Sequence, residues 1–184
     1  MGKRYEIDPI HSSVAFGIRH MMVATVRGRF GQFSGYVETE DGEPAGGQGE
    51  LVVQAASIDT GTEQRDNHLR SADFFETEKY PEIRFRSTSI ESAGGDRYRV
   101  LGDLTIRDVT RPVEFEGQVE GRISSDGWGN QRLAVSARGQ FDRKDFGLTW
   151  NQPMQEVGGL MVGDTVKFEV ELSLTHKTAE VAVG

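Results

Sequence analysis

Residues 166–174 have the sequence VKFEVELSL, in which apolar and polar side chains alternate without a break. This period of two is typical of a β-strand with one buried face, because successive side chains of a strand point to opposite faces. The stretch therefore predicts a strand whose valine, phenylalanine and leucine side chains face the interior. Its charged side chains are expected to face solvent.

The same alternation recurs along the chain. It is clear at residues 13–19, 113–120 and 133–141, and weaker at 33–38, 50–58, 83–90, 98–101 and at Leu104 with Ile106. Hairpin-type dipeptides lie between these stretches, at Asp41-Gly42, Gly46-Gly47, Gly94-Gly95 and Asp126-Gly127. The short links favour an antiparallel meander. The sequence predicts an all-β fold of about eight strands, paired as a sandwich or closed as a barrel.

A barrel of about eight strands either packs solid or holds one small ligand. Small residues, namely Gly117, Ala137 and Gly139, stand among the larger ones predicted to face inward. They would leave room for a ligand, or they would simply relieve crowding between strands. Composition does not decide between these alternatives.

Residues 62–75 break the alternation and are expected to form one or two short helical turns. On such a segment Asp66 and Arg70 are four residues apart and could pair on one face. We interpret its charged residues as a network that pins the segment across a barrel mouth, with Leu69, Phe74 and Phe75 as its apolar underside. Residues 142–163 form a second irregular stretch.

Composition excludes several functions. The net charge is −8, which argues against nucleic acid as a partner, and no window is long and apolar enough for an integral membrane segment. There are no cysteines, and the four histidines lack HxH or HxxxH spacing, so no metal site is predicted. No apolar stretch follows Lys3 and Arg4 as it would in a secretory signal, so we expect a cytoplasmic location.

Motifs spread over nearly the whole chain resemble the YceI family, a lipocalin-like bacterial group. They are Ile7-Asp8-Pro9, His11-Ser12-Ser13-Val14, Arg19-His20, Val26-Arg27-Gly28-Arg29-Phe30, Ser57-Ile58-Asp59-Thr60, Arg65-Asp66-Asn67-His68-Leu69-Arg70-Ser71-Ala72-Asp73-Phe74-Phe75, Lys79-Tyr80-Pro81, Gly102-Asp103-Leu104-Thr105-Ile106 and Asp145-Phe146-Gly147-Leu148. The resemblance implies a lipocalin-like, up-and-down antiparallel barrel of about eight strands with a helical insertion at one mouth, and residues 1–184 as a single domain. It also implies a long-chain isoprenoid ligand, such as a polyprenyl phosphate or an isoprenoid quinone. Many relatives are periplasmic.

We predict an apolar ligand site inside the barrel and a head-group site at its mouth. The interior residues are Val14, Phe16, Ile18, Phe30, Phe74, Phe85, Leu104, Val113, Phe115, Val135, Phe141, Phe146, Phe168, Val170 and Leu172. The mouth residues are His20, His68 and Arg70. His20 shares parity with the inward residues before it, but it could equally bond a neighbouring loop. The arginines at 19, 27, 29, 65, 70 and 143 are expected mostly to be solvated or paired at the surface.

Three hypotheses about function remain open. The first is non-catalytic binding, transport or storage of the isoprenoid, with no cofactor. The second is an enzyme on a lipocalin scaffold that acts on a quinone precursor or a lipid. The third is a ligand-free barrel that acts as a stress-response interaction module. The predicted inward residues contain no nucleophile–base pair and no carboxylate pair, which favours the first hypothesis. The sequence leaves a homodimer open.

Overall fold

The computed structural model describes residues 2–152 and 161–178 of the chain. Its strands are β1 (Gly2–Ile7), β2 (Ser13–His20), β3 (Ala24–Phe30), β4 (Phe33–Glu40), β5 (Glu43–Gln54), β6 (Ile58–Asp59), β7 (Glu82–Gly94), β8 (Arg97–Ile106), β9 (Val109–Ile123), β10 (Asn130–Asp142) and β11 (Val162–Lys177). The α-helix α1 covers Glu63–Arg70, and short 3₁₀ turns occupy Pro9–His11 (η1), Ala55–Ser57 (η2) and Arg143–Phe146 (η3). The predicted all-β antiparallel barrel with a short helix is confirmed.

Eight of the strands form a closed ring. Their order is β1-β4-β5-β7-β8-β9-β10-β11, and pairing of β1 with β11 closes the ring. Closure gives each of these eight strands a neighbour on both sides, so the ring itself has no free edge. From β7 to β11 each strand pairs with the next one along the chain, as expected for a meander, and short turns link the first four of these five strands.

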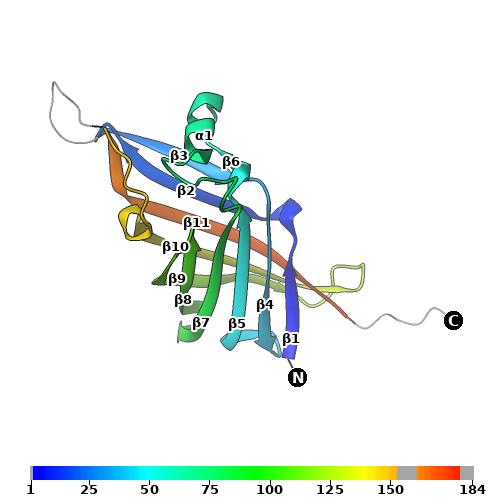
Figure 1. Ribbon diagram of the computed structural model, residues 1–184. Helices are drawn as coiled ribbons and strands as arrows, with labels where there is room; N and C mark the ends of the chain where they lie inside the picture. Colours follow the sequence, from blue (N-terminus) through cyan, green and yellow to red (C-terminus); the bar gives the residue numbers. More distant parts are fainter. Residues whose placement is uncertain (1, 153–160, 179–184) are drawn as a thin grey trace.

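The remaining strands build an arm on the ring. β11 pairs with β1 only at residues 174 and 175, and with β2 at residues 162–171. β3 then pairs with β2, and the short β6 pairs with β3. Because the chain bends at η1, β1 and β2 both pair with the same edge of β11, at different positions along it. The β2–β3 hairpin extends beyond the ring (Figure 1). This arm is a departure from the simple up-and-down order expected from the sequence.

Several strand boundaries differ from the prediction. Residues 50–58, predicted as one strand, belong to β5, the turn η2 and β6, because the chain bends there from the ring to the arm. The separate signals at 98–101 and 104–106 belong to the single strand β8. Alternation did not predict β1 or β3 as strands, although both are part of the sheet.

The interior is packed tightly at one end and loosely in the middle. Tyr5, Tyr98, Val119, Leu133 and Leu174 form a cluster in which no side chain is more than 5% exposed. In contrast, three large side chains that face inward at the waist, Phe16, Phe115 and Phe168, are only partly buried. Large apolar side chains facing the interior of a solid barrel would be fully buried, so the waist is hollow.

Glycines make room for inward phenylalanine rings. Gly28 lies opposite Phe16, and Gly139 opposite Phe168. A Cβ atom added at Gly139 would lie 2.7 Å from Cζ of Phe168 and 2.8 Å from Cβ of Phe115. At Gly139 the small residue therefore relieves crowding, the second of the two alternatives that the sequence left open.

Gly139→Val is expected to lower the free energy of unfolding by about 1–3 kcal/mol, because the added methyl groups must displace two packed rings. Urea denaturation measures the change. The matched control is Gly121→Val on β9, where an added Cβ would meet nothing within 4 Å. Equal losses in the two variants would show that β-strand glycines, and not the rings, set the cost.

Candidate functional site

An elongated apolar cavity of about 410 Å³ occupies the waist of the barrel and continues into the arm. Its volume lies within the range of about 300–1,000 Å³ that is usual for small-molecule sites. Along β11 its wall includes Val162, Val166, Phe168, Val170 and Leu172. At about 3.3 Å per residue, this stretch alone spans roughly 30 Å. The shape suits a long, thin, apolar molecule.

The structure places most of the sequence-predicted interior residues on this wall. Val14, Phe16, Ile18, Phe30, Phe74, Phe85, Leu104, Val113, Phe115, Val135, Phe141, Phe168, Val170 and Leu172 all line the cavity. Phe146 does not. It is 1% exposed, belongs to η3, and packs behind the wall residues Ile106 and Leu148, with its ring 5.3 Å from that of Phe141. It supports the site without reaching it.

Aromatic rings form a belt around the waist. The ring of Phe115 lies 5.0 Å from that of Phe85 and 5.5 Å from that of Phe168, measured between centroids. On the arm, Phe30 lies 5.5 Å from Phe16 and 6.0 Å from Phe75. These separations are favourable for edge-to-face and tilted pairs, which stiffen the wall beyond the effect of burial alone.

The helical segment lies at the arm end of the cavity, where α1 stands above β3 and β6 in Figure 1. Leu69 and Phe75 pack against the apolar cluster of the arm, as expected for the underside of a lid. His68 lines the cavity, and its Nε2 lies 2.9 Å from an oxygen of Asp73. Its ring also contacts the rings of Phe74 and Trp150, with centroids 5.1 and 4.6 Å away. A polar group thus sits among aromatic rings at this end.

The charges of the helical segment pair differently from the expectation. Asp66 does not pair with Arg70. Instead its carboxylate accepts hydrogen bonds from the backbone N–H and the hydroxyl of Thr60, at 2.8 and 2.5 Å. Arg70 donates to the carbonyls of Ala56 and Ile58, at 2.9 and 3.0 Å, and does not line the cavity. The segment is therefore held by hydrogen bonds to the backbone that precedes it, because the carbonyls of η2 and β6 lie within reach of Arg70.

Arg143 is buried, which corrects the expectation of a surface arginine. It is 1% exposed and lines the cavity. Its guanidinium donates to the carbonyls of Leu148 at 2.6 Å, Trp150 at 2.9 Å and Gly163 at 2.8 Å. Burial lowers the pKa of this group, and the charge of Asp164 opposes that shift. Arginine remains charged even so, and its planar fork ties the stretch 148–150 to the start of β11.

Tyr98 lines the cavity and brings a hydroxyl group to its wall. The hydroxyl of Tyr98 donates to a carboxylate oxygen of Glu43 at 2.7 Å. Burial is the main cause of a raised pKa at Tyr98, and this hydrogen bond raises it further. The hydroxyl of Tyr98 therefore has a hydrogen-bond partner within the protein and does not depend on a ligand for one.

Sequence reasoning missed several residues of the wall. They include Ile7, Tyr36, Val37, Arg65, Arg143, Trp150 and Met161. The alternation of Tyr5 and Ile7 with Arg4 and Glu6 could have indicated the first strand. No local pattern marks Trp150, because it is brought to the cavity by the carbonyl bonds of Arg143 and not by a strand.

Two side-chain arrangements that often mark reactive sites are absent from the described part of the chain. Within residues 2–152 and 161–178, no serine or threonine hydroxyl bonds a histidine ring. In the same part of the chain, no three metal-ligating side chains come together. None of the described helices has the length and apolar character needed to cross a membrane.

Residues 5–174 match the family model described as the YceI-like domain. The chain belongs to the YceI family. A UPF0312 protein of Staphylococcus aureus strain MSSA476 is 36% identical over 165 residues, which cover 90% of this chain and 93% of that protein. The corresponding protein of strain N315 matches with the same identity and coverage.

Solved YceI-like structures share the fold. Burkholderia cenocepacia BcnA superposes with a TM-score of 0.75 at 24% identity, covering 91% of this chain and 98% of that one. The Campylobacter jejuni YceI protein gives 0.74 at 24% identity, with coverages of 88% and 91%. A polyisoprenoid binding domain from Saccharophagus degradans gives 0.70 at 19% identity, with coverages of 94% and 98%.

Proposed function

We propose that this YceI protein binds a long isoprenoid lipid in its cavity and acts as a carrier or store, without catalysis. The observation that carries the proposal is the hollow waist, where large inward phenylalanines remain partly exposed around a space some 30 Å long at about 3.3 Å per residue. The Saccharophagus domain, described as binding polyisoprenoids, has the same fold and supports the choice of ligand class. A solid barrel would offer no such space.

The energetics favour an apolar chain over a head group. Burial of one CH₂-like group contributes about 0.8 kcal/mol, so three or four isoprene units contribute on the order of 10 kcal/mol before the cost of association. Chain length then sets most of the affinity. We propose that the head group lies at the arm end beside His20, His68 and Arg65, whose side chains line the cavity there.

The proposal is tested by organic extraction of the purified protein and mass spectrometry, followed by native mass spectrometry with a series of prenyl alcohols. We expect an isoprenoid in the extract and a Kd that falls roughly tenfold or more for each added unit until the cavity is filled. Straight fatty alcohols of matched carbon number are the control for general lipid affinity. Equally weak binding of short and long prenyl chains would rule the carrier out. The cytoplasmic location and the homodimer stay predictions.

A further inference from the structure

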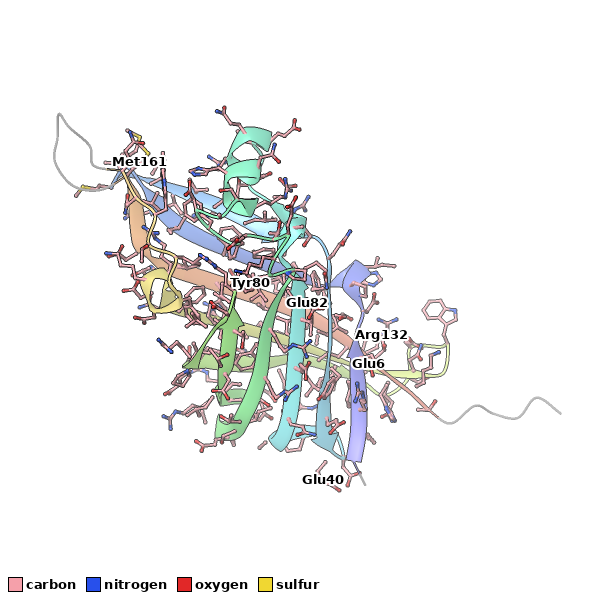
Figure 2. The ribbon with its side chains drawn as sticks, in the orientation of Figure 1. Glu6, Glu40, Tyr80, Glu82, Arg132 and Met161 are labelled. Carbon is pink, nitrogen blue, oxygen red and sulfur yellow. The ribbon has the colours of Figure 1, made fainter. Side chains whose placement is uncertain are left out.

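The tip of the β2–β3 hairpin presents apolar side chains to solvent. Residues 21–23 join the two strands, since His20 pairs with Ala24. Met21, Met22 and Val23 are 47%, 64% and 82% exposed. Figure 1 shows the hairpin reaching one extremity of the molecule, and Met161, labelled there in Figure 2, accepts a hydrogen bond from Met21 at 2.7 Å. Three adjacent exposed apolar residues on such a projection are unusual for a surface that meets only water.

The backbone of the tip is not one that favours these residues. Met21 and Met22 have φ angles of 53° and 63°, in the left-handed region. Hairpins with this geometry strongly favour asparagine and glycine, which adopt it at lower cost. Two methionines in this conformation lower the stability of the turn compared with asparagine and glycine. Local backbone strain of this kind is often associated with function.

The charge of the arm differs from that of the rest of the chain. Residues 9–37 contain three arginines and no aspartate or glutamate, in a protein of net charge −8. The strand register places Arg27 opposite Gly17 and Arg29 opposite Ala15, on the face of the arm away from Phe16 and Ile18. Arg29 has a weak ion pair with Asp59, whereas no described carboxylate pairs with Arg27. The arm therefore has a basic outer face in an acidic protein.

The apolar tip continues the wall of the cavity. Ile18 and His20 of β2 line the cavity, as do Met161 and Val162 on the neighbouring start of β11. The next residues along the chain are the exposed ones of the tip. A lipid that leaves a bilayer at this point would pass from acyl chains to methionine and valine, then past His20 to the apolar wall formed by Ile18 and Phe16 of β2.

We propose that the β2–β3 tip inserts into the surface of an anionic lipid membrane, and that the ligand enters and leaves the cavity there. This rests on the proposed function. Met21, Met22 and Val23 would lie among the lipid head groups and upper acyl chains, and Arg27 would contact acidic head groups. The basic arm also explains how an acidic protein approaches such a surface in one orientation.

The test is co-sedimentation with vesicles of phosphatidylcholine alone or with about one third phosphatidylglycerol. The wild type is expected to bind the anionic vesicles, and less so as salt is raised. The variant Met21→Asn/Met22→Gly should bind at least tenfold more weakly while its Tm equals or exceeds that of the wild type, because the turn is relieved of strain. Arg27→Glu should weaken binding by about fivefold or more.

Two variants serve as matched controls. Trp128→Ser removes an exposed apolar side chain, 84% accessible, from the β9–β10 connection next to the far end of β11. Arg97→Glu reverses an exposed charge on β8. Neither should change vesicle binding. The proposal is overturned if the wild type does not bind anionic vesicles or if the tip variant binds them as well as the wild type does. It is also overturned if Trp128→Ser loses as much vesicle binding as the tip variant.

A second measurement separates this inference from the proposed function. A short fluorescent geranyl probe is titrated into the protein without vesicles. The tip variant should bind the probe as the wild type does, yet exchange it with vesicles at least tenfold more slowly. Probe binding without vesicle attachment would overturn the inference and leave the carrier intact. Vesicle attachment without probe binding would overturn the carrier and leave the attachment standing.

Discussion

Ala137→Trp is expected to weaken binding of a prenyl chain of about four units by at least a hundredfold, with much less effect on a chain of about two units. Ala137 lies between Gly117 of β9 and Val170 of β11, and it lines the cavity at the waist. An indole there occupies space that the chain needs. The loss of room for one isoprene unit removes about 4 kcal/mol, or roughly a thousandfold in Kd. Native mass spectrometry with the prenyl series measures the change.

Gln140→Trp provides the control for this substitution. It adds the same side chain to β10 at an exposed position. Its Kd for the long chain should equal that of the wild type. Ala137→Trp would contradict the assignment of the cavity as the ligand site if it bound long chains normally while circular dichroism showed an unchanged barrel.

The sequence was most informative where strand alternation is long. In β11 the residues 166, 168, 170 and 172 line the cavity, whereas Lys167, Glu169 and Glu171 are exposed, as their parity predicts. The sequence of such a strand predicts which of its faces is buried, because a shift of one residue in register would put every apolar side chain in water. The wall could be predicted almost residue by residue for this reason.

Residues whose position depends on tertiary contacts could not be predicted in this way. Phe146 is large and apolar like the wall residues, but η3 places its side chain behind Phe141. Arg143 resembles a surface arginine until the chain returns with carbonyls at 148, 150 and 163 to surround it. In both cases partners that no local pattern reveals determine the position.

The choice between a solid and a hollow barrel also needed the structure. Gly139 and Ala137 are two residues apart on one face of β10, yet they have different structural roles. The ring of Phe168 covers Gly139, whereas Ala137 borders the cavity. Whether a small residue leaves space depends on the side chain opposite it, so residue size alone could not decide.

Arg143→Met is expected to lower the free energy of unfolding by about 3–5 kcal/mol, because one buried and two partly buried carbonyls lose their donor together. For a chain of this size that corresponds to a fall of roughly 10 °C in Tm. Methionine fills much of the same volume, so the loss reports the hydrogen bonds more than a cavity. The stretch 148–150 would be released, and with it the contact of Trp150 with His68 at the end of the cavity.

Thermal melts of two further variants isolate this effect. Arg138→Met removes an exposed arginine from the same strand and should change the free energy of unfolding by no more than about 0.5 kcal/mol. Arg143→Lys keeps the charge but not the planar fork, so it should fall between the wild type and Arg143→Met. It also gives a readout if the methionine variant does not fold. A Tm for Arg143→Lys equal to that of the wild type would mean that charge alone holds this end of the cavity, and that the three directed bonds contribute nothing.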